Sequence, residues 1–566
     1  MRRWLARQWL VLFAISWFSV AAPAAESSDA VPDSVSVVLR LKAPKATVEK
    51  LSEFVDAVQP GFGAAVQGGL PALGMAIVNP GLTGVDVEQD WWAIVFADAP
   101  RQKPSVVFVV PATDGDALKK ALPTGFQAHV SDKLVAYSES EEALGRIRDR
   151  LSGKGTGLWS KIDAASKKQF DTSDISVLVH LRQLSKAFEN ELQQAEPQLD
   201  LLLNQITAAM PEAQRSQFAP MLEMYRVLGK SAVQGVRDSE SLTLGVSFSK
   251  ESIRFQDRLQ VAEGTATAKF FASQPTSELS LLNQLPANKP VYAGVKADMA
   301  GMIDWSMKMT QSMMSNASAD QKAQLETSMK EMRSLKWNEM AVYFNVDPSA
   351  SGVIRAGSVM EITPTNRLRD ISRSMVKAIG EVQSFGFKQT IKLESAAEKI
   401  GGQEVDRITT VQEVDPALDP QGLQKKIRDV MFGDAGMVQL VMYQPTRSLQ
   451  TFGGGTAELQ SLATALESTT SKDSAAAAAR KRLVEKANVV ALVDLARLVV
   501  SGLKVAAREG TLPVDATAIH GLQLQPSFIG FSVACGPTSA GAQLDIPVEQ
   551  AQGIAKIVML FLNRGR

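Results

Sequence analysis

The chain has 566 residues, of which 45% are hydrophobic, and its 60 basic residues are balanced by 60 acidic ones. Its length exceeds that of one ordinary core, so roughly two to four modules are expected. The charge balance argues against nucleic acid as a partner, because phosphate binding needs clustered positive charge. It gives no indication of an anionic membrane surface as a partner either.

Residues 1–25 have the three parts of an export signal. Three arginines precede an apolar run from Trp9 to Val20, and small residues surround Ala24, as signal peptidase requires. The run is shorter than the roughly 20 residues that a membrane span needs, although a retained N-terminal anchor is the alternative. We predict a signal peptide and a mature protein that is periplasmic or secreted, with no membrane span after cleavage.

Residues 26–170 are predicted to form a first α+β module. A strand, residues 34–41, is followed by an amphipathic helix over 45–58, with apolar residues at helical spacing. Trp91 and Trp92 then open another strand. Because strand side chains alternate between faces, we expect one indole inward and one outward, and an exposed Trp91 is a candidate contact residue.

Residues 171–280 are predicted to form a second module. An apolar strand at 175–179 passes directly into a long helical region, roughly 184–229, which Pro211 interrupts. Apolar residues then alternate with polar ones over 242–248 and 253–261. This alternation indicates two half-buried antiparallel strands joined by a turn.

Residues 281–400 are predicted to form a third module with a methionine-rich helical insert. The candidate ligand or partner contacts in this insert are Met302, Trp305, Met309 and Met313. Methionine fills irregular gaps between helices, so ordinary packing is one interpretation. An adaptable apolar groove is a second, and thioether binding of Cu(I) is a third.

Residues 401–566 are predicted to form a fourth module, which ends in a strand over 529–535 and a terminal helix. Cys535 is the only cysteine, so no disulfide can form within the chain, and its place in an alternating strand predicts a small buried apolar side chain. The apolar run 557–562 is too short to span a membrane and is expected to lie buried in the terminal helix.

The predicted fold class is α+β. Tandem diverged modules of strand, helical insert, hairpin and helix are expected to build mainly antiparallel sheets covered by helices. The segments "NQLPANKPVYAGVKADMAGMI" and "NPGLTGVD" with "WWAIVFAD" resemble repeated units of exported bacterial proteins of unknown function. That resemblance implies export and a modular build, and it implies no activity.

No motif for catalysis, a cofactor or a metal is complete. His129, His180 and His520 are widely separated and belong to no ligand motif, and Ser532 lies inside an alternating strand rather than at the sharp turn of a nucleophile elbow. We therefore predict no catalytic, cofactor-binding or metal-binding residues and a protein that is not an enzyme.

The sequence predicts an exported, non-enzymatic binding or scaffolding protein of the cell envelope. Its contact surfaces are expected on the long helical inserts, because insertions that vary between repeats tend to lie on the binding face. The alternative is a carrier of an apolar ligand held between a sheet and the methionine-rich helices. The partner is accordingly an unknown protein or an apolar ligand.

Overall fold

The computed structural model describes residues 28, 30–100, 102–131, 133–299, 301, 303, 319–384, 387–414, 419, 421–468, 472–510 and 516–562. The chain divides into two compact units. Unit 1 comprises residues 1–196, 232–272 and 536–555, and unit 2 comprises residues 197–231, 273–535 and 556–566. Both combine helices with antiparallel strands, which confirms the predicted α+β class.

Unit 1 is built on one antiparallel sheet with the strand order β4-β5-β3-β2-β1-β6-β7-β8-β19. Its strands are β1 (Val37–Leu41), β2 (Trp91–Phe96), β3 (Ser105–Pro111), β4 (Gln127–Ser131), β5 (Leu134–Ser138), β6 (Ile175–Val179), β7 (Ser239–Phe248), β8 (Ser252–Val261) and β19 (Ser539–Pro547). Its helices are α3 (Pro44–Val58), α4 (Gly63–Gln67), α5 (Leu70–Ala76), α6 (Gly115–Ala121), α7 (Glu141–Leu151), η2 (Leu158–Ser160), α8 (Ala164–Thr172), α9 (Leu181–Ala187) and α12 (Ala266–Ser273).

Helices cover both sides of the first half of this sheet. On one side, α7 and α8 pack on β1 to β6 through a core that includes Trp92, Ile147 and Phe170. On the other side, α5 and α6 pack on β1 to β5 through a core that includes Trp91 and Tyr137. Since both sides are covered, Trp91 is only 1% exposed and Trp92 is buried as well. The expectation of an exposed indole is therefore wrong for both rings.

The strands of unit 2 are also antiparallel, in the order β12-β13-β14-β15-β16-β11-β10-β9-β17-β18. Its strands are β9 (Val291–Val295), β10 (Lys336–Val346), β11 (Ile354–Thr363), β12 (Glu381–Ser384), β13 (Phe387–Ile400), β14 (Gln403–Val414), β15 (Met437–Tyr443), β16 (Arg447–Phe452), β17 (Val489–Val493) and β18 (Ile529–Gly536). Its helices are η3 (Ser280–Gln284), α14 (Ala319–Arg333), α15 (Thr365–Ile379), α16 (Leu423–Phe432), α17 (Gly455–Ala465), α18 (Ser474–Lys481), α19 (Leu495–Arg508) and α20 (Ala516–His520).

Three long helices contain residues of both units: α10 (Glu189–Ala209), α11 (Glu212–Asp238) and α21 (Val548–Leu562). The predicted proline break falls between α10 and α11, at Pro211. In the part of the chain that the structure describes, no helix is both long and apolar enough to cross a membrane. The end of α21 is nevertheless not buried as expected, because Phe561 and Leu562 project into solvent.

A strand followed by a helical segment, two further strands and a helix begins at β1, at β6, at β9 and at β17. The interpretation of these stretches as four diverged modules, and the module limits given above, remain predictions. Residues 1–25, the predicted export signal, lie outside the described residues.

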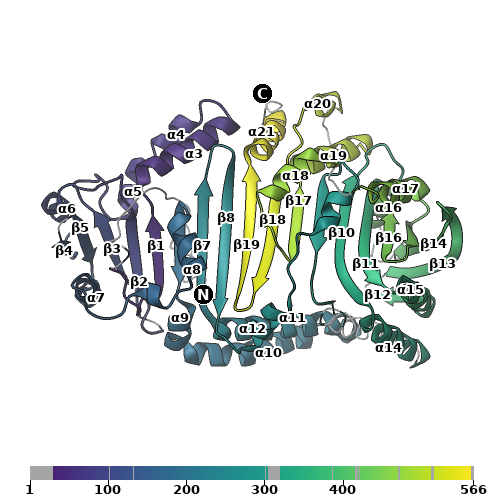
Figure 1. The fold of residues 1–566 in the computed structure, drawn as a ribbon, viewed down its shortest axis with the longest axis horizontal. Coiled ribbons are helices and arrows are strands. Elements are labelled where there is room, and N and C mark those ends of the chain that lie inside the picture. Colours follow the sequence, from purple (N-terminus) through teal and green to yellow (C-terminus); the bar gives the residue numbers. More distant parts are fainter. Residues whose placement is uncertain are drawn as a thin grey trace. The chain divides into compact units, whose positions relative to one another are not determined.

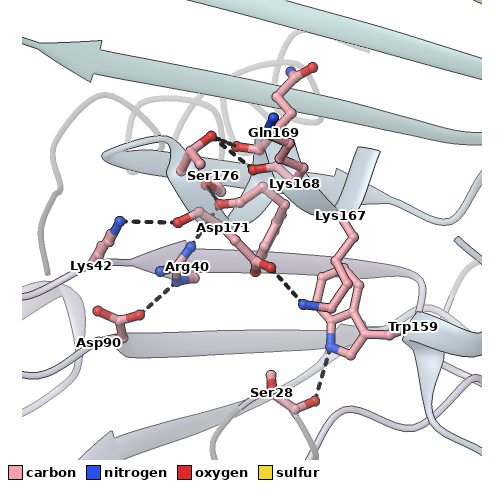
Figure 2. Close-up of polar contacts among 12 residues, drawn as sticks. Ser28, Arg40, Lys42, Asp90, Trp159, Lys167, Lys168, Gln169, Asp171 and Ser176 are labelled. Carbon is pink, nitrogen blue, oxygen red and sulfur yellow. Dashed lines mark hydrogen bonds and ion pairs between the residues drawn. The ribbon is translucent and has the colours of Figure 1, made fainter. Parts of the chain in front are cut away.

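A buried ion pair links the strands of unit 1 to α8. Arg40 on β1 donates hydrogen bonds to Asp90 and to the carbonyl oxygen of Phe170, both at 2.7 Å. Its guanidinium lies over the rings of Trp92 and Phe170, with its carbon 5.8 and 5.9 Å from the ring centroids. Figure 2 shows Arg40 between Asp90 and the α8 segment, beside the contact of Lys42 with Asp171. This network fixes the position of α8 on the sheet.

Candidate functional site

The most unusual feature of unit 1 is the side of β7 that is buried. Ser241 and Thr243 are fully buried beneath α8, whereas Leu244, which points to the other side of the strand, is 36% exposed. A strand at the surface of a globular protein ordinarily has its apolar side chains inward and its polar ones outward. In β7 this arrangement is reversed.

The close approach of α8 explains why the polar side is covered. Gln169 of α8 donates hydrogen bonds to the carbonyl oxygens of Thr243 and Gln256, at 3.3 and 3.1 Å. Gly245 leaves room for this contact, because a Cβ atom there would lie 2.1 Å from Ser173 Oγ and 2.9 Å from its Cβ. Small residues on this side of β7 therefore allow the helix to bind the strand by hydrogen bonds.

The same side of β8 and β19 is also polar, and its groups are paired. Ser252 Oγ donates to Asp545 Oδ1 at 3.1 Å, and Arg254 lies 3.4 Å from the same oxygen. Arg258 forms an ion pair of 3.3 Å with Asp163, the residue that caps α8. Buried polar groups require such partners, so the polar side of these strands is the structural side.

The other side of these strands is apolar, and the strand register brings its side chains into continuous rows. One row runs from Ile175 through Val246 and Phe255 to Leu544. We call this surface the unit 1 apolar face. Its members are Ile175, Val177, Val179, Leu242, Leu244, Val246, Phe248, Ile253, Phe255, Leu259, Leu544 and Ile546.

The unit 1 apolar face is largely buried at β6, most exposed at β7 and β8, and half-buried at β19. Val177 on β6 is buried, Leu244 on β7 is 36% exposed, and Phe255 on β8 is 41% exposed. The helices α5 and α6 cover the same side of the sheet over β1 to β5, and α3, whose Val48 packs in the same core, reaches β7. Figure 1 shows β7 and β8 side by side, with α8 beside β7. Two exposed apolar side chains among half-buried ones make this surface a candidate binding site.

Unit 2 carries a second surface of the same kind. On β18, Ser532 is fully buried whereas its neighbour Phe531 is 38% exposed. The register continues the side of Phe531 onto β17, β9 and β10 with half-buried apolar residues. We call this surface the unit 2 apolar face. Its members are Val291, Ala293, Val295, Met340, Val342, Phe344, Val489, Ala491, Val493, Ile529, Phe531 and Val533.

One carboxylate interrupts the unit 1 apolar face. Asp257 lies between Leu244 and Ala542 in the register, and Phe255 and Leu259 flank it along β8. Its Oδ1 accepts a hydrogen bond of 3.0 Å from the Ala542 N–H. Burial raises the pKa of the Asp257 carboxyl above its ordinary value, an effect that this hydrogen bond opposes.

The predicted contact residues of the methionine-rich insert lie outside the described residues: Met302, Trp305, Met309 and Met313. Three methionines beside them are described. Met299, Met329 and Met332 pack in a small apolar cluster with Ile303 and Leu325. The cluster agrees with the packing interpretation for these three residues. The apolar-groove and Cu(I) interpretations of the insert remain predictions.

The side chains that the sequence offered as candidate reactive groups, His180 and Cys535, lie in positions where they contribute to the packing. His180 caps α9, its Nδ1 lies 3.2 Å from the Val35 carbonyl oxygen, and burial lowers its pKa. Cys535 is half-buried on β18, and burial raises the pKa of its thiol, which disfavours the reactive thiolate. Within the described ranges, no group of three or more acidic, histidine or cysteine side chains is arranged to hold a metal ion.

A hollow of about 590 Å³ on unit 2 is lined mainly by polar residues, among them Trp337, Asn338, Glu361 and Arg447. Its carboxylate is already engaged, since Asn338 and Arg447 donate to Glu361 at 2.6 and 3.1 Å. These contacts connect β10, β11 and β16 to one another. They explain the polar lining as part of the strand packing.

The sequence predicted the strands of the unit 1 apolar face but not its role. The alternation over 242–248 and 253–261 correctly indicates β7 and β8, and it assigns each side chain to a side. It does not tell which side a helix covers. The available signal was Asp257, a charged residue at an apolar position of the alternation, together with Ser241, Thr243 and Gly245 on the other side.

Comparison of the chain with models of protein families, with curated protein sequences and with solved structures found no match.

Proposed function

We propose that the protein is a non-enzymatic binding protein of the cell envelope that holds a hydrocarbon ligand on the unit 1 apolar face. The single observation that supports this proposal best is the reversed burial of β7, with Thr243 covered and Leu244 exposed. Burial of apolar surface contributes about 25 cal/mol of favourable free energy for each Å² removed from water. Binding of an apolar ligand to this face would therefore be favourable.

The hydrogen bonding of the sheet favours a hydrocarbon chain over a peptide. β7 is paired with β6 and β8, and β8 is paired with β7 and β19, so neither strand has a free edge that could pair with an added strand. Apart from Asp257, the side chains of the face offer no hydrogen-bonding group. A peptide lying on it would have unsatisfied backbone groups, whereas an alkyl chain has none.

The proposal that the protein is exported to the cell envelope rests on the sequence. The basic, apolar and small-residue segments of residues 1–25 support delivery across a membrane. A carrier of a poorly soluble molecule is of use in an aqueous compartment such as the periplasm or the exterior. The unit 2 apolar face supports a second site of the same ligand chemistry.

The exposed residues of the face provide the test. In the double variant L244D/F255D, the two charges should weaken binding of the uncharged fluorescent probe N-phenyl-1-naphthylamine by about tenfold or more, because two apolar contacts are lost. The measurement is a fluorescence titration of delipidated protein. The matched control is F270D, since Phe270 on α12 is 61% exposed and lies on no sheet.

Unchanged unfolding midpoints in all three proteins would show that the variants are folded. Equal probe binding by L244D/F255D and by the parent protein would contradict the proposal. Loss of binding in F270D would mean that the probe binds elsewhere.

A second candidate function is a protein-binding scaffold, for which α10 and α11 are the observation. The two helices are joined by ion pairs of Asp200 with Arg226 and Lys230, at 2.9 and 3.0 Å. They nevertheless leave several large apolar side chains in solvent: Leu201, Leu202, Ile206, Tyr225, Val227 and Leu228. This surface supports the scaffolding hypothesis, which placed partner contacts on the helical inserts.

A further inference from the structure

The unit 1 apolar face contains one charged residue. In the described strands that form it, Asp257 is the only acid or base among positions that are otherwise aliphatic or aromatic. Glu240, near the start of β7, is paired with Arg182 at 2.8 Å and belongs to the strand end. The carboxylate of Asp257 is therefore set within the apolar surface rather than at its rim.

Asp257 does not have a structural partner of opposite charge. Its hydrogen bond comes from the neutral N–H of Ala542, and no described cationic group lies within 4 Å of its oxygens. Buried Asp238 likewise accepts from neutral groups, the Thr267 hydroxyl and the Gln234 amide, but two other buried acids of this unit face a cation. Asp90 has Arg40, and Asp174 has Lys50 at 3.1 Å.

The ionised form of an unpaired carboxyl group is unfavourable in free energy where the surroundings are partly apolar. A cation beside the carboxylate reduces this penalty. The raised pKa of the Asp257 carboxyl has the same cause, namely burial without a compensating positive charge. The register places Asp257 on the surface that the proposed ligand covers, opposite Leu244 and between Phe255 and Leu259 along β8. A ligand carrying its own cation would pair with this carboxylate.

We infer that the ligand of the unit 1 apolar face is a cationic amphiphile, in which a protonated amine pairs with Asp257 while the hydrocarbon chain lies along β7 and β8. This inference rests on the proposed function, because it assigns the headgroup chemistry of the same site. It commits to an ammonium group on an alkyl chain, and it predicts discrimination against carboxylate headgroups by like-charge repulsion.

The test compares three amphiphiles with the same decyl chain: decylammonium, decyl glucoside and decanoate, each below its micellar concentration. Each displaces N-phenyl-1-naphthylamine from the parent protein, and the competition gives its affinity. Decylammonium should bind about tenfold more tightly than decanoate, as expected for one ion pair of moderate burial. The neutral glucoside should lie between them.

The variant D257N should bind all three amphiphiles with similar affinity and should bind the glucoside no more weakly than the parent. The matched control is E263Q, because Glu263 is an exposed acid in the turn after β8 and its replacement changes net charge equally. E263Q should keep the full preference for decylammonium.

The outcomes separate the two proposals. If no amphiphile displaces the probe and no probe binds, the proposed function fails. If all three bind the parent protein equally, the function stands and the headgroup inference is overturned. If D257N keeps the preference, the ammonium group is recognised elsewhere and the assignment to Asp257 is wrong.

Discussion

At the scale of single residues, the charged groups of unit 1 fall into two kinds. Arg40 and Asp90 are buried together, and every strong contact of Arg40 is made within the protein, with Asp90, with the Phe170 carbonyl oxygen and with two aromatic rings. Asp257 has only a backbone N–H. Buried pairs fix structure, whereas a half-buried group without a counter-charge is available to a ligand.

Replacement of Arg40 with methionine tests whether the buried Arg40–Asp90 pair stabilises the fold. R40M leaves the Asp90 carboxylate buried without a cation, which should lower the free energy of unfolding by about 3–5 kcal/mol. Urea unfolding followed by tryptophan fluorescence measures the change. The double variant R40M/D90L should recover most of the loss, because removing both charges restores an apolar pair.

The surface pair Lys45–Glu88 provides the control for R40M. Both of its side chains are more than half exposed, so K45M should leave the unfolding curve unchanged. If R40M were as stable as K45M, the buried network would not determine the position of α8.

At the scale of elements, much of the fold follows from sequence patterns. The alternation of apolar residues indicates β7 and β8, and the predicted break at Pro211 falls between α10 and α11, although α10 continues through another proline, Pro197. The burial of both indoles on β2 could not be predicted from the sequence pattern. It depends on α5, α6, α7 and α8, which cover two sides of the sheet through contacts distant in sequence.

The covered side of β7 could not be predicted for a similar reason. Ser241, Thr243 and Gly245 form an ordinary polar side by composition, and only the approach of α8, with Gln169 bonding to the strand carbonyl oxygens, makes it the interior. A polar side that is satisfied by a helix and a polar side that is hydrated have the same sequence pattern. Hydrogen bonds between distant elements decide between them.

The contact between α15 and β14 in unit 2 predicts that the stability of the protein depends on pH. Arg373 of α15 donates two hydrogen bonds to Asp406 of β14, at 2.7 and 2.6 Å. Burial opposes the ionised carboxylate, but the Arg373 hydrogen bonds and the Ala396 N–H outweigh burial and hold the pKa of Asp406 below its ordinary value. Its stabilisation is therefore present above the unfolded-state pKa, about 4, and is lost as the pH falls through the lowered folded-state pKa.

D406N should accordingly be less stable than the parent by about 1–3 kcal/mol at pH 7, because one charge-assisted contact is removed. The difference should shrink below about pH 4, where Asp406 becomes protonated in the unfolded chain, and should vanish as the pH falls through the lowered pKa of Asp406 in the folded parent. Urea unfolding across this pH range measures it, with D370N as the control because Asp370 is exposed on the same helix. A difference that does not change with pH would contradict the assignment.

At the scale of the whole molecule, we propose different roles for the two kinds of exposed apolar surface. The strands β7 and β8 have one side fixed by polar contacts with α8, and we propose that their other side, the unit 1 apolar face, binds a hydrocarbon ligand. The helices α10 and α11 expose apolar residues that favour a protein partner. The sequence placed contact residues on the helical inserts, since inserts vary, and it treated the alternating strands as ordinary core.

Photo-crosslinking tests the central claim most directly. A decylamine derivative carrying a diazirine at the end of its chain is bound to the full-length protein and irradiated, and the labelled peptides are identified by mass spectrometry. Our account predicts labels concentrated in residues 239–261 of β7 and β8, and their loss in L244D/F255D. Labels confined to α10 and α11, or unchanged in that variant, would contradict it.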